Sequence, residues 1–200
     1  MTTRTKRRGL GPDTLRLLLP HGRPFLFVDR VLGYQLGETP ELHACRHISH
    51  NEAVFEGHFP GWSLWPGVYT IEGMGQSAQL LSVLRAIERA GEKAGDPELG
   101  LRALEALDAE RSGRPSSAPD PAGMTLLREL RELRALGVAT RVDVRLTEPV
   151  LAGSMLEYRV AILREQDGLV TYTVRAEVRG VVVARGELGA SGNLSVPRTE

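Results

Sequence analysis

The residues of this chain that could do chemistry gather in one short stretch, EGHFPGWSLWPGVYTIEGMGQ, at residues 56–76. His58 and Glu72 lie fourteen residues apart in it. A histidine accepts and releases protons near neutral pH, and a carboxyl group can serve as the acid beside it. Such a pair could remove a proton next to a carbonyl group and assist the loss of a β-hydroxyl group as water.

The segment between these two residues is stiff. Pro60 and Pro66 restrict φ, whereas Gly61 and Gly67 permit tight turns and a close approach of the backbone. Gly67 comes just before a predicted helix at 68–90, so its N–H is a candidate donor to a carbonyl oxygen. We expect the loop to hold the histidine beside the start of this helix.

Glu72 is unusual because the helix that carries it is otherwise apolar. The helical spacing rests on Ile71, Met74, Ala78, Leu81, Leu84 and Ile87. A carboxylate in a buried helix is costly unless it has a partner or a function. Spacing alone leaves open that a loop histidine and a helix-capping glutamate are purely structural.

The remaining elements predict an α+β domain. A short helix at 13–19, with Asp13 as its cap, precedes strands at 25–36 and 41–48. From residue 138 onward the apolar residues recur every second position, which is typical of antiparallel strands. We therefore expect the sheet to wrap around the helix at 68–90.

Residues 91–137 differ in character from their surroundings. A charged helical pattern runs into a loop rich in Ser, Pro and Gly, and an amphipathic helix is predicted at 124–136. Leu126, Leu130 and Leu133 lie on one side of that helix. This leucine stripe favours a packing face over a ligand site.

Composition excludes several classes of protein. Hydrophobic residues make up 42% of the chain, which is ordinary for a globular protein. The formal net charge is zero, so electrostatics do not favour nucleic-acid binding. The basic segment at 3–9 is predicted to be a solvated, disordered terminus. Cys45 is the single cysteine, which excludes an intrachain disulfide and fits a reducing compartment. No apolar run is long enough to span a bilayer, so we expect a soluble, cytoplasmic protein without membrane contact.

Other sites are weaker candidates. His43, Cys45, His47 and His50 are close in sequence, but zinc sites usually draw their ligands from more than one element. Ordinary polar strand positions explain them better than a metal site. The chain has no P-loop, dinucleotide fingerprint or nucleophile elbow.

The stretch at 56–76 resembles the active-site segment of the FabZ-type 3-hydroxyacyl-[acyl-carrier-protein] dehydratases. Their pattern is H-F-P-G-x-P-x-x-P-G-V-x-x-x-E-x-x-x-Q, and this chain matches it at His58, Phe59, Pro60, Gly61, Pro66, Gly67, Val68, Glu72 and Gln76. LLPHGRPFLFVDRV at 18–31 and RLTEPVLAGSML at 145–156 also resemble the family. The resemblance covers about 18–90 and 138–190, which is most of the chain.

The resemblance implies a hot-dog fold, and a homodimer, possibly part of a higher oligomer, whose active site lies at the subunit interface. His58 of one subunit would take the C2 proton of a (3R)-hydroxyacyl thioester, and Glu72 of the other would assist departure of the C3 hydroxyl group. Gly67 would hold the thioester carbonyl, and Gln76 would support Glu72. Substrate-binding roles are also implied for Phe59, Pro66 and Val68. The resemblance implies no metal or other cofactor. The acyl chain would be attached to the phosphopantetheine arm of acyl carrier protein.

The resemblance also implies which of two related activities the protein has. The related FabA type, which isomerises the double bond as well, has Asp where this chain has Glu72, so dehydration alone is implied. The product would be a trans-2-enoyl thioester in fatty-acid or polyketide-like biosynthesis. A hot-dog thioesterase and a non-catalytic hot-dog partner module stay open as alternatives.

Some positions depart from the family pattern. Ser63 replaces a proline, and Gly73 and Gly75 replace alanines. The largest departure is an insertion at about 91–137 within a single domain at 1–200. It could be a surface elaboration, or its helix could cap the acyl tunnel or dock a partner protein.

Overall fold

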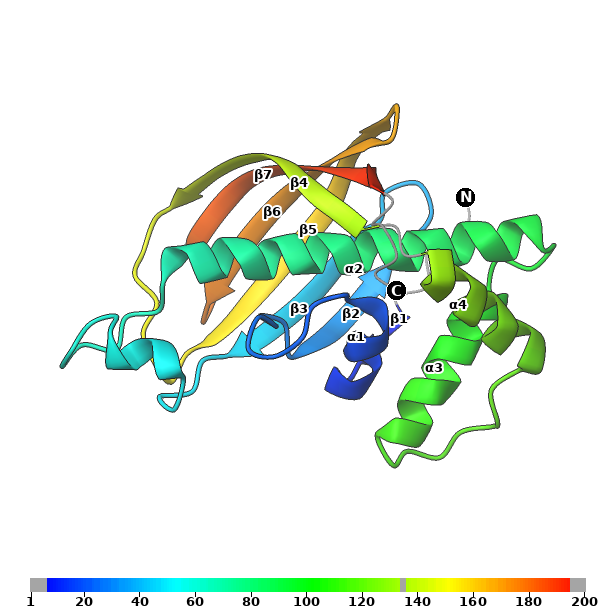
Figure 1. Cartoon of the computed structure of the whole chain (residues 1–200), viewed down its shortest axis with the longest axis horizontal. Helices are drawn as coiled ribbons and strands as arrows, with labels where there is room; N and C mark the ends of the chain where they lie inside the picture. Colours follow the sequence, from blue (N-terminus) through cyan, green and yellow to red (C-terminus); the bar gives the residue numbers. More distant parts are fainter. Residues whose placement is uncertain (1–6, 134–135, 195–200) are drawn as a thin grey trace, which may run out of the picture.

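A computed structural model describes residues 7–133 and 136–194 of the chain. One seven-stranded antiparallel sheet curves around a long central helix, α2 (Gly67–Lys93) (Figure 1). In spatial order the strands are β1 (Arg7–Leu10), β2 (Arg30–Gln35), β3 (Glu41–His47), β5 (Met155–Gln166), β6 (Leu169–Val178), β7 (Val181–Leu194) and β4 (Leu136–Leu146). The predicted α+β hot-dog fold is confirmed.

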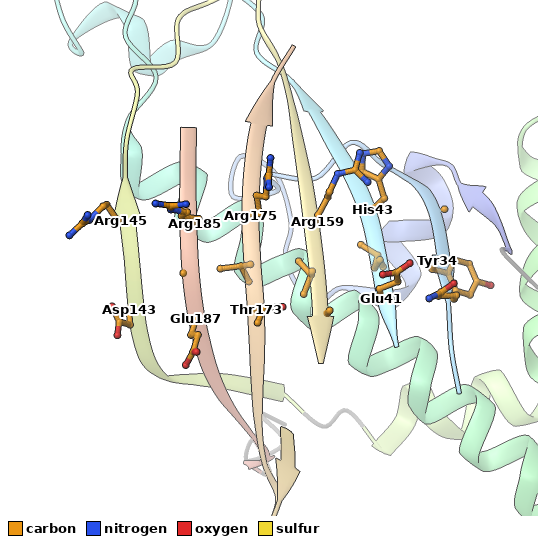
Figure 2. Close-up of a pocket in the computed structure, with 17 residues that line it drawn as sticks. Tyr34, Glu41, His43, Asp143, Arg145, Arg159, Thr173, Arg175, Arg185 and Glu187 are labelled. Atoms are coloured by element: carbon orange, nitrogen blue, oxygen red, sulfur yellow. The ribbon is translucent and has the colours of Figure 1, made fainter. Parts of the chain in front are cut away.

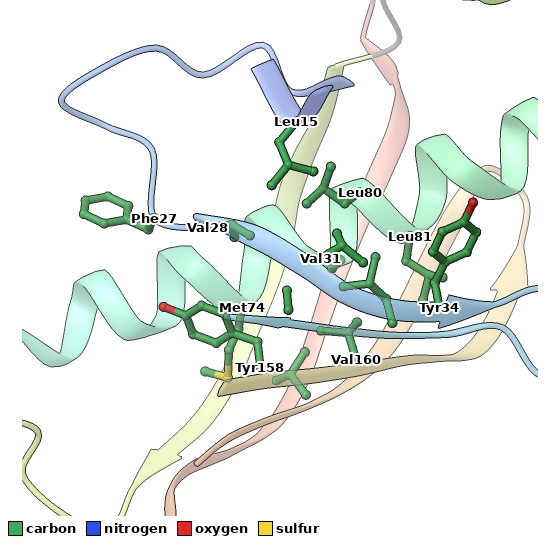
Figure 3. Packing of buried hydrophobic residues seen from close by; sticks show 14 of the residues in the cluster. Leu15, Phe27, Val28, Val31, Tyr34, Met74, Leu80, Leu81, Tyr158 and Val160 are labelled. Atoms are coloured by element: carbon green, nitrogen blue, oxygen red, sulfur yellow. The ribbon is translucent and has the colours of Figure 1, made fainter. Parts of the chain in front are cut away.

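The core lies between α2 and the sheet face that curves around it. Met74, Leu81 and Leu84 of α2 are completely buried, and Tyr158 and Val160 of β5 point toward the helix (Figure 3). Side chains alternate along a strand, so the residues between these positions lie on the face turned away from α2. The two faces of the sheet therefore serve different purposes, one packing and one exposed.

The predicted helix at 68–90 is confirmed as α2, with small differences at its ends. It begins at Gly67, directly after Pro66, and continues to Lys93. Two residues later Gly95 adopts a φ of +87°, a conformation that glycine tolerates and that commonly follows a helix.

Two predictions for the N-terminal segment are wrong. Helix α1 (Pro12–Leu18) has Gly11 at its N-cap, and Asp13 lies inside the first turn because Pro12 occupies the first helical position. Residues 3–6 of the predicted disordered segment lie outside the described residues. Residues 7–9 belong to strand β1, which pairs with β2.

The strand predicted at 25–36 is shorter than expected, whereas the one predicted at 41–48 is confirmed as β3. The backbone N–H of Phe27 donates to Oε1 of Gln76 at 2.8 Å, and the carbonyl of Phe25 accepts from Nε2 of Gln76 at 2.9 Å. A side chain thus satisfies backbone groups that a neighbouring strand would otherwise bind. The extended chain becomes strand only from Arg30.

The segment at 91–137 contains two helices, α3 (Leu99–Arg111) and α4 (Pro121–Leu133). Leu101, Leu104 and Leu126 belong to the same buried cluster as the residues of α2. Asp108 of α3 is 2% exposed and accepts a hydrogen bond from the backbone N–H of Gly11 at 2.7 Å. The segment therefore shares the main core, and its removal would expose apolar surface.

The helix predicted at 124–136 has different ends. It begins at Pro121 because the carboxylate of Asp120 accepts from the N–H groups of Ala122 and Gly123, at 2.8 and 3.1 Å, as an N-cap does. The helix ends at Leu133, and Leu136 already belongs to β4. Leu126 and Leu130 pack on the core as predicted, and the side chain of Leu133 lies outside the described residues. In the part of the chain that the structure describes, no helix has the length and apolar character to cross a membrane.

Candidate active site

The segment 58–66 is a stiff loop held at both ends. Phe59 and Trp62 exchange two backbone hydrogen bonds of 2.8 Å across Pro60 and Gly61, and Gly61 has a φ of +80°. Proline followed by a glycine with positive φ is the signature of a type II turn. The backbone N–H of Trp65 donates to the carbonyl of Val150 at 2.8 Å, which ties the loop to the chain before β5. The predicted rigid turn is present.

The ring of His58 has a defined orientation. Its Nδ1 lies 2.8 Å from the carbonyl oxygen of Leu64. Because a carbonyl oxygen only accepts, Nδ1 must carry a hydrogen in this bond, and in the neutral ring Nε2 then has a free lone pair. The ring of Phe59 stacks on that of His58 with centroids 4.3 Å apart. This geometry leaves Nε2 available as a base.

Gly67 lies at the first position of α2, with Pro66 as N-cap. The N–H of Tyr69 donates to the carbonyl of Pro66 at 3.0 Å, whereas the N–H groups before it have no acceptor within the helix. A Cβ added to Gly67 would lie 2.3 Å from Cδ1 of Leu146. Glycine therefore leaves room for the side chain of Leu146 at the start of α2. The start of a helix is its positive end and favours a negatively charged oxygen.

Glu72 lies one turn further along α2 and is oriented by Gln76. Nε2 of Gln76 donates to Oε1 of Glu72 at 2.9 Å, while the rest of the same amide binds the 25–27 backbone. Gln76 is 1% exposed and the side chain of Glu72 is 32% exposed. The carboxyl group is thus held by a buried amide but still reaches the surface.

His21 lies beside Glu72, a contact that the sequence did not predict. Its Nε2 lies 3.6 Å from Oε1 of Glu72, and its buried Nδ1 has no hydrogen-bond partner within the described residues. The segment 18–31 that contains His21 resembles the family, but the sequence assigns no role to this histidine. The contact arises because the 25–27 backbone is bound to Gln76, which brings the preceding residues to the same face of α2.

The two central residues do not meet within the single chain. His58 is bonded to Leu64 and, through its backbone N–H, to Val54, whereas Glu72 interacts with Gln76 and His21. No hydrogen bond or ion pair joins His58 to Glu72 in the described parts of the chain. The remaining site residues lie near the same end of α2, with Phe59 and Val68 exposed and Pro66 buried.

The histidines and the cysteine around β3 do not form a metal site. Nε2 of His43 lies 2.7 Å from a carboxylate oxygen of Glu157, and Cys45 is completely buried. Burial raises the pKa of the Cys45 thiol to about 11. Across residues 7–133 and 136–194, no three histidine, cysteine or acidic side chains are placed to hold a metal ion together.

Gly73 and Gly75 differ sharply in their surroundings, and this predicts opposite effects of alanine. A Cβ on Gly73 would lie 2.2 Å from the hydroxyl oxygen of the buried Tyr158, so Gly73→Ala is expected to lower the free energy of unfolding by about 1–3 kcal/mol. Gly75→Ala is the matched control, because apart from the neighbouring residues and the backbone of its own helix no described atom lies within 4 Å of its Cβ. It is expected to stabilise the helix by up to about 1 kcal/mol. Urea unfolding of both variants measures the difference, and equal shifts would contradict the packing of Tyr158 against Gly73.

Comparison with known proteins agrees with the fold. Residues 19–100 match the family model of the FabA-like domain. The solved dehydratase heterocomplex ApeI:P from Xenorhabdus doucetiae superposes with a TM-score of 0.53 at 16% identity, covering 90% of this chain and 91% of that one. At this identity the superposition speaks for the fold alone.

Curated relatives extend over nearly the whole chain. The 3-hydroxyacyl-[acyl-carrier-protein] dehydratase FabZ of Thiobacillus denitrificans is 32% identical over 174 residues, which cover 86% of this chain and 90% of the relative. The FabZ of Aeromonas salmonicida is 30% identical over 185 residues, covering 92% and 94%. With this similarity over most of its length, the chain belongs to the FabZ family of 3-hydroxyacyl-[acyl-carrier-protein] dehydratases.

Proposed function

We propose that the protein converts (3R)-hydroxyacyl thioesters on acyl carrier protein into trans-2-enoyl thioesters by removing water. The observation that carries this proposal is the hydrogen bond of His58 Nδ1 to the carbonyl of Leu64, because it leaves Nε2 as a base. The FabZ relatives support the substrate class. The pathway would be fatty-acid or polyketide-like biosynthesis.

In this reaction Nε2 of His58 takes the C2 proton, and the electrons of the C–H bond form the C2–C3 double bond. The C3–O bond breaks, and the leaving oxygen takes a proton from the carboxyl group of Glu72 to depart as water. The N–H of Gly67 donates to the thioester carbonyl, where negative charge develops. Return of the proton from His58 to Glu72 restores the starting state.

Gln76 has a supporting role in the same proposal. Its amide donates to Oε1 of Glu72, so Oε2 is the oxygen free to face the substrate. Exposed Phe59 and Val68, together with buried Pro66, would line the approach of the acyl chain. Because Glu72 stands where the FabA type has Asp, we propose dehydration without isomerisation.

We further propose a homodimer in which His58 faces Glu72 of the second copy. β4 is the last strand on one side of the sheet, and among the described residues it pairs only with β7, so its other edge is open. Exposed apolar side chains gather beside this edge and at the start of α2, namely Val68 (67%), Val142 (54%) and Leu146 (49%). A second β4 paired to this edge would continue the sheet and cover these side chains.

The partner in catalysis would be acyl carrier protein, and the proposed chemistry uses protein groups without a metal or redox cofactor. We propose that residues 1–200 form one hot-dog domain with the segment 91–137 inserted in it. The buried leucines of α3 and α4 support one domain, because they share the core of α2. A cytoplasmic location stays a prediction.

Mass spectrometry of the acyl chain tests the activity directly. Incubation with a 3-hydroxyacyl carrier protein is expected to yield an acyl chain lighter by one water. Release of a free acid would instead indicate a thioesterase, and an unchanged acyl chain would indicate a non-catalytic module. Retention of the double bond at C2 separates dehydration alone from dehydration with isomerisation.

Substitution of Gln76 by leucine tests its supporting role. The change leaves the buried N–H of Phe27 without its acceptor and Glu72 without its donor. We expect a loss of about 1–3 kcal/mol in the free energy of unfolding. A roughly tenfold or larger fall in kcat with little change in KM is also expected, because the amide orients the acid and not the substrate.

Gln79→Leu on the same helix is the control for this substitution. Loss of stability with unchanged kcat would leave Gln76 a structural residue only.

A further inference from the structure

The face of the sheet turned away from α2 carries a row of positive side chains (Figure 2). Arg145 of β4 lies directly opposite Arg185 of β7, which lies opposite Arg175 of β6, which lies opposite Arg159 of β5. His43 of β3 continues the row beside Arg159. With neighbouring strands about 4.8 Å apart, the row runs roughly 19 Å across the sheet.

Carboxylates neutralise only one half of this row. Arg175 pairs with Glu177, and Arg159 lies 3.9 Å from Glu177. His43 is paired with Glu157.

The other half has no such compensation. Arg145 and Arg185 make no ion pair within residues 7–133 and 136–194, and the nearby carboxylate of Asp143 is bound by Arg141 at 3.0 Å. Both arginines are exposed. Like charges directly opposite each other destabilise a sheet, so this pair carries a cost that a bound anion would remove.

The row forms one wall of a hollow of about 680 Å³. Small side chains make its floor, since Ala161 lies opposite Thr173 in the next row along the strands, and Gly33 lies beside His43. Glu41 stands at one end of that second row, and Glu187 and Asp143 stand at the other end, next to the arginines in Figure 2. Sites for small molecules commonly have this size and a few placed polar groups.

The charges around the hollow select the kind of ligand. Guanidinium groups bind phosphate oxygens in a two-point geometry, which makes neighbouring arginines suited to phosphate groups. Carboxylates accept hydrogen bonds from hydroxyl groups and repel further negative charge. Acidic side chains beyond the row therefore disfavour a broad anionic surface, such as nucleic acid or an acidic protein.

We propose that this hollow binds a small phosphate ester with hydroxyl groups, with its phosphate on Arg145 and Arg185 and its hydroxyls toward Glu187. The site is independent of the proposed dehydration, because its residues lie on the opposite face of the sheet from α2.

Calorimetric titration of the full chain at low salt tests the proposal, with ADP and fructose 1,6-bisphosphate as probes. At least one is expected to bind with a dissociation constant below about 1 mM. The variant with Arg145→Gln and Arg185→Gln should bind about 10-fold or more weakly, since charge-assisted hydrogen bonds are lost. The control with Arg164→Gln and Arg179→Gln removes the same charge from exposed positions outside the hollow and should bind like the wild type.

Three outcomes would overturn the proposal. They are the absence of binding by both probes, equal weakening by the two double variants, and binding of a glutamate-rich helical peptide or a DNA duplex in place of the phosphate esters. All substituted arginines are exposed, so melting temperatures near that of the wild type are expected and verify that each variant is folded.

Discussion

Replacement of His58 by alanine is expected to lower kcat/KM for dehydration by about 10²- to 10⁴-fold. The imidazole is the only base that the proposed reaction uses, and its Nδ1–H is held by Leu64 at 2.8 Å. Loss of that hydrogen bond should cost only about 0.5–1.5 kcal/mol of the free energy of unfolding, because the side chain is only partly buried. Steady-state kinetics with a 3-hydroxyacyl carrier protein, together with urea unfolding, separates the two effects.

His47→Ala is the matched control for this experiment. The side chain of His47 is 62% exposed, and it lies on β3, outside the loop at 58–66. Its replacement is expected to change kcat/KM by less than about threefold. Activity of the His58 variant close to that of the wild type would remove His58 from the proposed chemistry.

Mixing two inactive variants is expected to restore activity if His58 and Glu72 of different subunits form each site. In a mixture of His58→Ala and Glu72→Ala proteins, random exchange makes half of the dimers mixed. Each mixed dimer has one intact site, so about one quarter of the wild-type activity should return. The structure favours this outcome because no hydrogen bond or ion pair joins the two residues within the described single chain.

The control mixture contains His58→Ala and a chain carrying both substitutions. No subunit of this mixture carries His58, so the mixture should stay inactive. Native mass spectrometry of differently tagged subunits verifies that exchange has taken place. Proven mixed dimers without recovered activity would show that both residues of a site come from one chain, and would contradict the shared site.

Much of the fold was predictable because local patterns follow secondary structure. The apolar helical spacing at 68–90 predicted α2, and the period of two after residue 138 predicted the late strands. The residues at 25–29 were mispredicted as strand, since β-forming side chains are there but the backbone binds Gln76. The start of α4 was missed although Asp120, a favourable N-cap residue, directly precedes it.

The candidate site, too, was predictable from the sequence only in part. Residues 58–76 were identifiable because the loop and its helix are continuous in sequence, with turn residues at definite positions. His21 was not, since its approach to Glu72 depends on where the chain returns after α1. The sequence alone could not show that Gly73 is closely packed and Gly75 is not. The difference comes from Tyr158, which lies on a distant strand and packs against Gly73.

The sequence by itself determined the kinds of elements, the family resemblance and the residues of the stretch at 56–76. These depend on local geometry, in which a proline, a glycine or an apolar period acts over a few residues. Only the tertiary structure decided which strands pair and in what register. The arginine row shows the reason: its members lie on four strands, and pairing brings them into line through contacts that no local pattern encodes.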